Sequence, residues 1–91
     1  MAYRQWGIEN DLRWSEVVRR PVALAKMRGM VRTGEARELR IGSGLSLREV
    51  ADDIGVNPTS VYHWEQGVCL PRGPHALKYA RLLEALRKAA H

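Results

Sequence analysis

The stretch GVNPTSVYHWEQG, Gly55 to Gly67, sets the end of one helix and both ends of the next within one short segment. Gly55 follows an apolar helical run, where a chain commonly leaves a helix through the left-handed backbone that glycine adopts most easily. Asn57 is a favourable N-cap and Pro58 a favourable first helical residue, so a new helix is predicted from Pro58 to the residue before Gly67. So tight a turn fixes the angle at which the two helices cross.

The helix before this turn has an equally clear start. Ser46 and Glu49 form an S-x-x-E capping box, which predicts a helix over Leu47–Ile54. Two short helices can cross steeply only where the residue at their closest approach is small, and Ala51 meets that need. Their shared core is predicted from the apolar positions that face inward at helical spacing: Val50, Ile54, Val56, Val61 and Trp64. This is the layout of a DNA-binding helix-turn-helix.

The second helix of this pair has two unlike faces. Successive residues lie about 100° apart around a helix axis, which places Ser60, Val61 and Trp64 on the inner side. The outer side is polar, capable of hydrogen bonding and free of acid, as a surface that enters the major groove should be. It carries Thr59, Tyr62, His63 and Gln66.

The rest of the chain predicts further helices. Leu, Ala, Arg and Glu are common and Phe is absent, which favours an all-α fold, and 91 residues suffice for one compact core. Asp11–Arg20 is predicted to be a short helix that Pro21 ends or kinks, followed by a second from Val22 to about Arg32. Thr33 is predicted to cap a helix over residues 34–41, and the last helix to run from about His75 to Ala89 after a loop over residues 70–74.

We therefore divide the chain into a basic N-terminal arm and helical extension, residues 1–33, and a helix-turn-helix DNA-binding domain, residues 34–91. The extension carries an apolar stripe formed by Leu24, Met27 and Val31. This stripe is either buried within the monomer or available for dimerisation. The sequence leaves both readings open.

The positive charge is concentrated in the extension. The net charge is +5, and residues 1–33 hold seven basic and three acidic side chains against eight and seven in residues 34–91. Because phosphate contacts dominate affinity and base contacts dominate specificity, the two tasks are predicted to fall on different segments. Arg48 and Arg72 are predicted to contact phosphates beside the helix-turn-helix. Arg4, Arg13, Arg19 and Arg20 are candidates for an arm on the DNA, with an ordinary solvated surface as the alternative.

Several function classes find no support in the sequence. The lone Cys69 has no evident base and no glycine-rich phosphate loop occurs, so no catalytic residues and no enzyme activity are expected. His63, Cys69 and His75 match no familiar zinc spacing, and neither a metal, a cofactor nor a small-molecule ligand is expected. Without a signal peptide or a long apolar run, the protein is expected in the cytoplasm rather than in a membrane.

From Ala36 to Leu83 the chain resembles the Xre/Cro helix-turn-helix family of bacterial and phage regulators. The resemblance rests on ARELRIGSGLS, LREVADDIGV, TSVYHWEQG and KYARLL, which fall in register without gaps. The TGEAR lead-in and the VYHWE centre also look like the small actinobacterial and actinophage members. The resemblance implies a lambda-repressor-like helix-turn-helix, which the predicted N-terminal helical extension precedes.

The resemblance also implies roles for individual residues. Base-facing positions would be held by Pro58, Thr59, Tyr62 and His63, and we add Asn57 from the start of the same helix to the predicted base contacts. Gln66 and backbone amides near the helix starts would face phosphates. Arg40 and Glu65 match the positions of a structural Arg–Glu pair that ties the first helix of the family to the end of the recognition helix.

These features predict a sequence-specific double-stranded DNA-binding transcriptional regulator, a Cro-type phage or bacterial repressor that acts by operator occupancy. Specificity usually needs a symmetric dimer, although a monomer that uses its basic extension as the second contact remains open. The alternative is an antitoxin or antirepressor-like protein-interaction module. Leu47, where many members have a phosphate-contacting glutamine, and Pro58, which offers no polar side chain, motivate that alternative.

Overall fold

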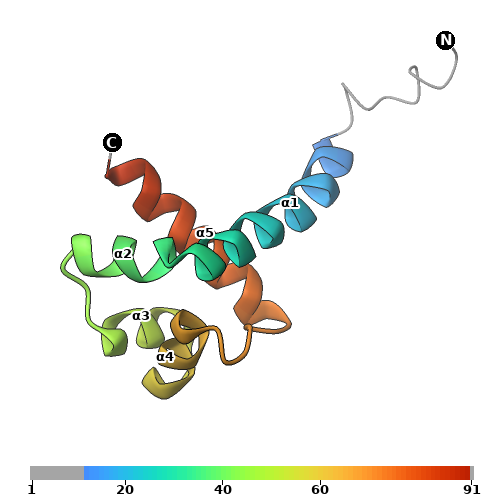
Figure 1. The fold of residues 1–91 in the computed structure, drawn as a ribbon. Helices are drawn as coiled ribbons and strands as arrows, with labels where there is room; N and C mark the ends of the chain where they lie inside the picture. Colours follow the sequence, from blue (N-terminus) through green and yellow to red (C-terminus); the bar gives the residue numbers. More distant parts are fainter. Residues whose placement is uncertain (1–11, 91) are drawn as a thin grey trace, which may run out of the picture.

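The computed structural model describes the backbone of residues 12–90 and the side chains of residues 19–90, and every regular element in this range is a helix. The helices are α1 (Leu12–Thr33), α2 (Glu35–Gly42), α3 (Leu47–Ile54), α4 (Pro58–Gln66) and α5 (Pro74–Ala89) (Figure 1). The predicted all-α fold is confirmed. In the part of the chain described, none of the helices has the length and apolar character needed to cross a bilayer.

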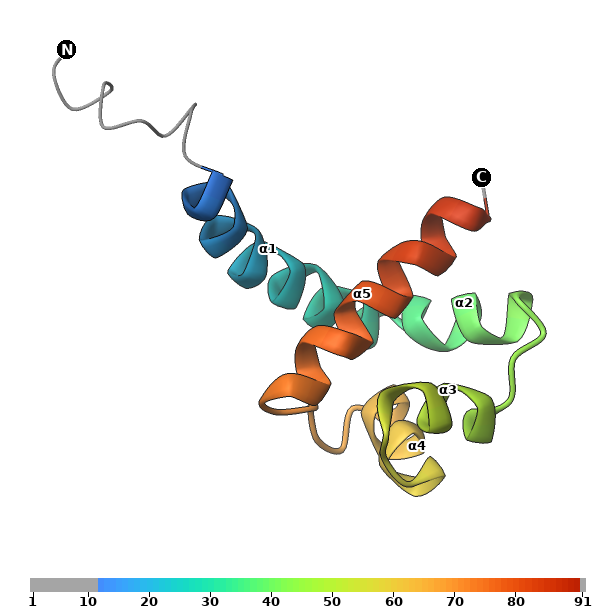
Figure 2. The same ribbon diagram turned by 180° about the vertical axis from the view of Figure 1, so that it is seen from behind.

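The two long helices organise the others. α1 and α5 cross and pack against each other, and α2 contacts both of them. α3 and α4 pack together at one end of the molecule, whereas the N-terminal half of α1 projects from the opposite end (Figures 1 and 2). The helix-turn-helix and the start of α1 therefore lie on different sides of the fold.

One hydrophobic core joins all five helices. Its buried residues are Met27, Met30, Val31, Ala36, Val50, Ala51, Ile54, Val61, Trp64, Ala76, Tyr79, Ala80 and Leu83. Met27 is only 1% exposed and Val31 7%, while Leu24 is partly buried against the same core. Of the two readings of the Leu24, Met27 and Val31 stripe, burial within the monomer is the one found.

The prediction that a helix could end at Pro21 is wrong. α1 runs from Leu12 to Thr33 with Pro21 inside it. Proline removes one backbone hydrogen bond, but its fixed φ is itself helical, so the flanking turns can keep their own hydrogen bonds and continue the helix. The turns after Pro21 also gain from burying Met27 and Met30 in the core.

The predicted cap of the next helix also needs correction. Gly34, with φ +87°, is the N-cap of α2 and makes no side-chain capping bond. Thr33 is the last residue of α1, and its hydroxyl lies 3.4 Å from the Glu35 amide. A single left-handed glycine thus turns the chain from α1 into α2. The other boundaries differ little from those predicted, with α2 ending at Gly42 and α5 starting at Pro74.

Candidate nucleic-acid interface

The turn between α3 and α4 is built as its sequence predicts. The Ser46 hydroxyl accepts a hydrogen bond from the Glu49 amide at 3.0 Å, and the Glu49 carboxylate accepts one from the Ser46 amide at 2.9 Å. Gly55 ends α3 with φ +91°, and its amide donates to the Ala51 carbonyl at 2.8 Å. Ala51 is fully buried. The small side chain and the left-handed turn together let α4 follow α3 closely.

The ends of α4 are also defined by local hydrogen bonds. The Asn57 side-chain oxygen accepts from the Thr59 amide at 2.8 Å, and Pro58 occupies the first turn. At the other end Gly67 takes φ +75°. With its oxygen accepting from the Thr59 amide, Asn57 keeps the two N–H donors of its side-chain amide available.

The two faces of α4 are separated as predicted. Val61 is fully buried and Trp64 is 5% exposed. The Trp64 ring packs against Tyr79 of α5, with centroids 4.9 Å apart and an interplanar angle of 48°. Burial raises the pKa of Tyr79, with a smaller contribution from the charge of Glu65. A neutral aromatic pair therefore supports the inner face of α4.

The outer face of α4 is open to a ligand. Tyr62 is 48% exposed, Thr59 and Gln66 are exposed, and His63 is half-buried. The rings of Tyr62 and His63 lie side by side, with centroids 6.0 Å apart. This face offers hydroxyl, imidazole and amide groups, which can both donate and accept hydrogen bonds, and it presents no carboxylate.

A buried ion pair anchors the C-terminal end of α4 to α2. The Arg40 guanidinium donates to both carboxylate oxygens of Glu65, at 2.6 and 3.0 Å, and to the Leu45 carbonyl at 3.0 Å. The Glu65 side chain is only 2% exposed, and its hydrogen bond raises the pKa of Arg40. Such a bidentate contact fixes orientation as well as distance. Glu65 is therefore committed to holding α4 in place.

The predicted phosphate contacts near the helix-turn-helix are all exposed. Arg48 is the second residue of α3, Gln66 is the last residue of α4, and Arg72 lies in the segment between α4 and α5. None of the three is part of the core. All three side chains are therefore accessible to a ligand.

The predicted contacts on α1 are placed differently. Arg19 and Arg20 are exposed and line a groove between α1 and α5, on the half of α1 that lies away from α3 and α4 (Figures 1 and 2). Arg4 and the side chain of Arg13 lie outside the described residues. The structure thus does not bring Arg19 and Arg20 together with α4.

Two other arginines of α1, which the sequence did not single out, lie close to the helix-turn-helix. Arg28 and Arg32 line a hollow of about 650 Å³ together with Gln66 and Gly67 at the end of α4. In the sequence both belong to the basic extension, residues 1–33, and no local pattern distinguishes them from the other basic residues of that segment. Only the contact between α1 and α4 reveals their position.

The two departures from the family pattern have structural explanations. Leu47 is partly buried and packs against the core. Pro58 is half-buried in the first turn of α4, where its missing backbone donor costs nothing. Both residues stabilise the helix-turn-helix, so neither argues by itself against DNA binding.

Comparison with known proteins agrees with this geometry. The family described as "Helix-turn-helix domain" matches residues 34–90, the segment that holds α2 to α5. No curated protein and no solved structure matches the chain. With the capped α3–α4 pair, the exposed polar face of α4 and this match over more than half of its length, the chain belongs to the helix-turn-helix family of DNA-binding domains.

Proposed function

We propose that this protein is a sequence-specific transcriptional regulator of double-stranded DNA, a Cro-type repressor of phage or bacterial origin that acts in the cytoplasm by occupying an operator. The observation that carries the proposal is the contrast between the two sides of α4. Trp64 and Glu65 hold the helix rigidly from within, while its outer face carries exposed hydrogen-bonding groups. A rigid helix with a free polar face suits the major groove.

In this proposal the outer face of α4 reads base edges. Thr59 and Tyr62 offer hydroxyl groups and His63 an imidazole, each able to pair with acceptors or donors in the major groove. Asn57 contributes its side-chain nitrogen, and the ring of Pro58 is suited to apolar contact with a thymine methyl group. Specificity would come from these five residues together.

Affinity would come from phosphate contacts around the same face. Arg48, Gln66 and Arg72 are exposed at the start of α3, at the end of α4 and just beyond it. Arg19 and Arg20 remain predicted phosphate contacts for DNA that reaches the start of α1. One recognition helix reads only a few base pairs, so we expect a homodimer on two half-sites about 34 Å apart, one helical turn of DNA.

Selection from a randomised duplex library at two salt concentrations tests the proposal. The wild-type protein should enrich one motif, and its symmetry should show whether two copies bind. The triple substitution Thr59→Ala, Tyr62→Ala and His63→Ala should abolish the enrichment, since each good base contact contributes about 1–3 kcal/mol. Arg37→Ala with Glu38→Ala, two exposed residues of α2, is the matched control and should enrich the wild-type motif.

A sequence-blind interaction that collapses with salt would contradict the proposal, and the antitoxin or antirepressor-like alternative would then take its place. The buried residues of α1 offer no surface on which to test that alternative. Because Met27 is 1% exposed, a charge there would unfold the domain rather than block a partner. Protein partners have to be sought at exposed residues.

A further inference from the structure

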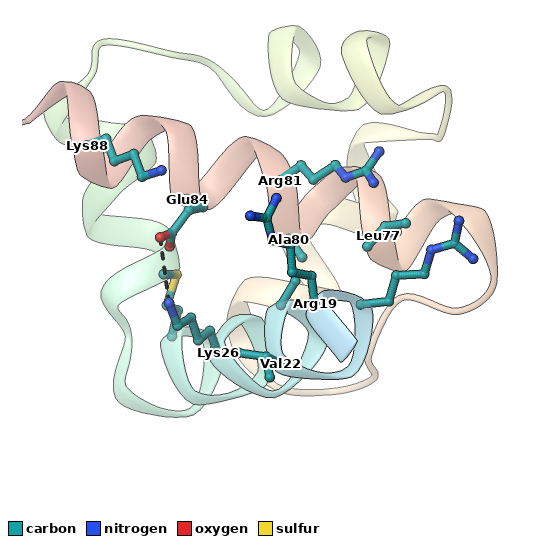
Figure 3. A pocket seen from close by; sticks show the side chains of 11 residues that line it. Arg19, Val22, Lys26, Leu77, Ala80, Arg81, Glu84 and Lys88 are labelled. Carbon is teal, nitrogen blue, oxygen red and sulfur yellow. Dashed lines mark ion pairs between the residues drawn. The ribbon is translucent and has the colours of Figure 1, made fainter. Parts of the chain in front are cut away.

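A groove of about 580 Å³ lies between α1 and α5 and is lined by side chains from both helices (Figure 3). Its rim is strongly basic, with five cations against the single carboxylate of Glu84. These cations are Arg19, Arg20, Lys26, Arg81 and Lys88. None of the residues of α3 or α4 lines this groove.

The floor of the groove is apolar. Met30 and Ala80 belong to the buried core and reach the groove from below, and Leu77 lines it from α5. Val22, on the α1 side, is 49% exposed. A strip of apolar surface is thus bordered by positive charge, and water covers it when nothing else does.

The carboxylate in the groove is held beside one of the cations. Lys26 and Glu84 face each other at 3.8 Å (Figure 3), and the Lys26 side chain is 53% exposed. Such a long, solvated pair contributes little and can rearrange. Arg81 and Lys88 approach the same groove from α5 (Figure 3). The groove therefore keeps a positive rim although it contains an acid.

Both helices contribute apolar and basic side chains to the groove. The lining residues of α1 extend from Arg19 to Met30 and those of α5 from Leu77 to Lys88. Because α1 and α5 cross, these two spans run in different directions from the place where the helices meet (Figures 1 and 2). A short amphipathic helix could lay an apolar stripe on the floor and place acidic side chains against the cations of both helices, the mode of helix-in-groove complexes.

Two other occupants, a second copy of this chain and a DNA backbone, would fit the groove less well. A second copy of this chain carries a net charge of +5, and a self-complementary contact through the groove would set basic rim against basic rim. A DNA backbone would neutralise the rim but has no apolar surface to cover Val22 and Leu77. An acidic, amphipathic segment satisfies both the charge and the floor.

We propose that the groove between α1 and α5 is a docking site for an acidic amphipathic helix of a partner protein. This inference goes beyond DNA binding, since it gives the chain a second surface. Because the groove and the outer face of α4 share no residue, base reading by α4 is compatible with this partner, whereas DNA that reached Arg19 and Arg20 would compete with it for those two residues.

Selection from a displayed library of random peptides, about 16 residues long, tests the docking site. The folded full-length wild-type protein is the bait, and Arg81→Glu with Lys88→Glu is used for counter-selection. We expect enriched peptides that combine Asp or Glu with apolar residues at i, i+3 or i+4, and i+7. A pool without enriched acidic residues, or one that binds both proteins equally, would overturn the proposal.

Fluorescence anisotropy of one enriched peptide then locates the contact. The Arg81→Glu, Lys88→Glu protein should bind it at least tenfold more weakly than the wild type, and Val22→Glu should weaken it as well. Arg37→Glu with Lys78→Glu, exposed residues that do not line the groove, makes the same change in net charge and should bind within twofold of the wild type. Equal weakening in this control would mean general charge attraction and would refute docking in the groove. Circular dichroism confirms that each variant is folded.

Two further measurements separate this site from the proposed function and from self-association. Affinity of the Arg81→Glu, Lys88→Glu protein for the selected duplex should stay within threefold of that of the Arg37→Glu, Lys78→Glu control, which carries the same net charge, whereas a loss comparable to that of the triple α4 variant would assign the groove to DNA. Sedimentation of the free protein should show no dimer that depends on Arg81 and Lys88. Such a dimer would make a second copy the occupant and would overturn the proposal.

Discussion

At the scale of single residues, two ion pairs of similar geometry differ in their surroundings. Arg40 and Glu65 form a bidentate pair whose carboxylate is only 2% exposed, whereas Arg87 and Glu35 form one in which both side chains are about a third exposed. Removing one partner of a buried pair leaves a charge without compensation in a poorly solvated place. An exposed pair is screened by water and salt. The two pairs should therefore respond very differently to the same substitution.

We expect Glu65→Ala to destabilise the domain by about 3 kcal/mol, the lower end of the range for breaking a buried pair, because Arg40 keeps some access to water. Urea denaturation followed by circular dichroism measures the free energy of unfolding. Glu35→Ala is the matched control and should cost far less. Similar losses from the two substitutions would show that burial does not set the strength of the Arg40–Glu65 pair.

The exposed Arg87–Glu35 pair is expected to make the stability of the folded state depend on pH. The hydrogen bond from Arg87 lowers the pKa of Glu35 below its ordinary value of 4.5. A carboxylate whose pKa is lowered by folding stabilises the folded state above the unfolded pKa, and this contribution is lost as the pH falls through the folded pKa. An NMR titration should place the pKa of Glu35 below 4.5, and Arg87→Met should return it toward 4.5. An unchanged pKa in that variant would contradict the assigned cause.

At the scale of elements, caps and turns determine where α3 and α4 begin and end. The Ser46–Glu49 capping box lowers the pKa of Glu49 through hydrogen bonds from the Ser46 backbone amide and hydroxyl. Gly55 and Gly67 both end their helices with positive φ. Glycine is favoured at Gly55 because the backbone there is left-handed. Lack of space is not the reason, since a Cβ atom added at Gly55 would meet no neighbour within 4 Å.

Two glycines should respond to alanine with opposite signs. Gly55→Ala puts a Cβ atom on a backbone with φ +91° and should destabilise the protein by about 1 kcal/mol. Gly29 lies inside α1, and the nearest atom to an added Cβ is the end of the flexible Arg32 side chain at 3.8 Å. Gly29→Ala should therefore stabilise by about 0.5–1 kcal/mol, as helix propensity predicts. Thermal denaturation of both variants checks the pair, and a stabilising Gly55→Ala would refute the backbone argument.

At the scale of the whole molecule, α1 belongs to the same core as the segment that matches the helix-turn-helix family. The matched segment starts at residue 34, yet Met27, Met30 and Val31 are buried between α1 and the other helices. Burying side chains of this size stabilises a fold by about 1.5–3 kcal/mol each. Since a small domain is stable by only about 5–15 kcal/mol in total, α1 is a substantial part of what keeps this domain folded.

We therefore expect a chain of residues 34–91 alone to be mostly unfolded. Without α1, the helices α2, α4 and α5 would expose the surface that now contacts it. Circular dichroism and urea denaturation should show reduced helicity and no cooperative transition, and Met30→Ala in the full chain should show an intermediate loss of about 2–5 kcal/mol. A cooperative transition of residues 34–91 with the stability of the full chain would show that α1 is dispensable.

The parts of this protein that its sequence determined are those that depend on neighbouring residues. Capping at Ser46 and Asn57, the turn at Gly55 and the division of α4 into an inner and an outer face follow from hydrogen bonds and side-chain spacing within a few residues. The pairing of Arg40 with Glu65 joins distant residues, and it was accessible in advance only through the resemblance to a family.

Tertiary structure decided the rest. Contact between α1 and α4 places Arg28 and Arg32 beside the recognition helix, and contact between α1 and α5 gathers basic side chains around a separate groove. The continuation of α1 through Pro21 also contradicts the local pattern. Charge and composition state how many arginines a chain has, but their positions in space depend on which helix faces pack together, and long-range packing sets that outcome.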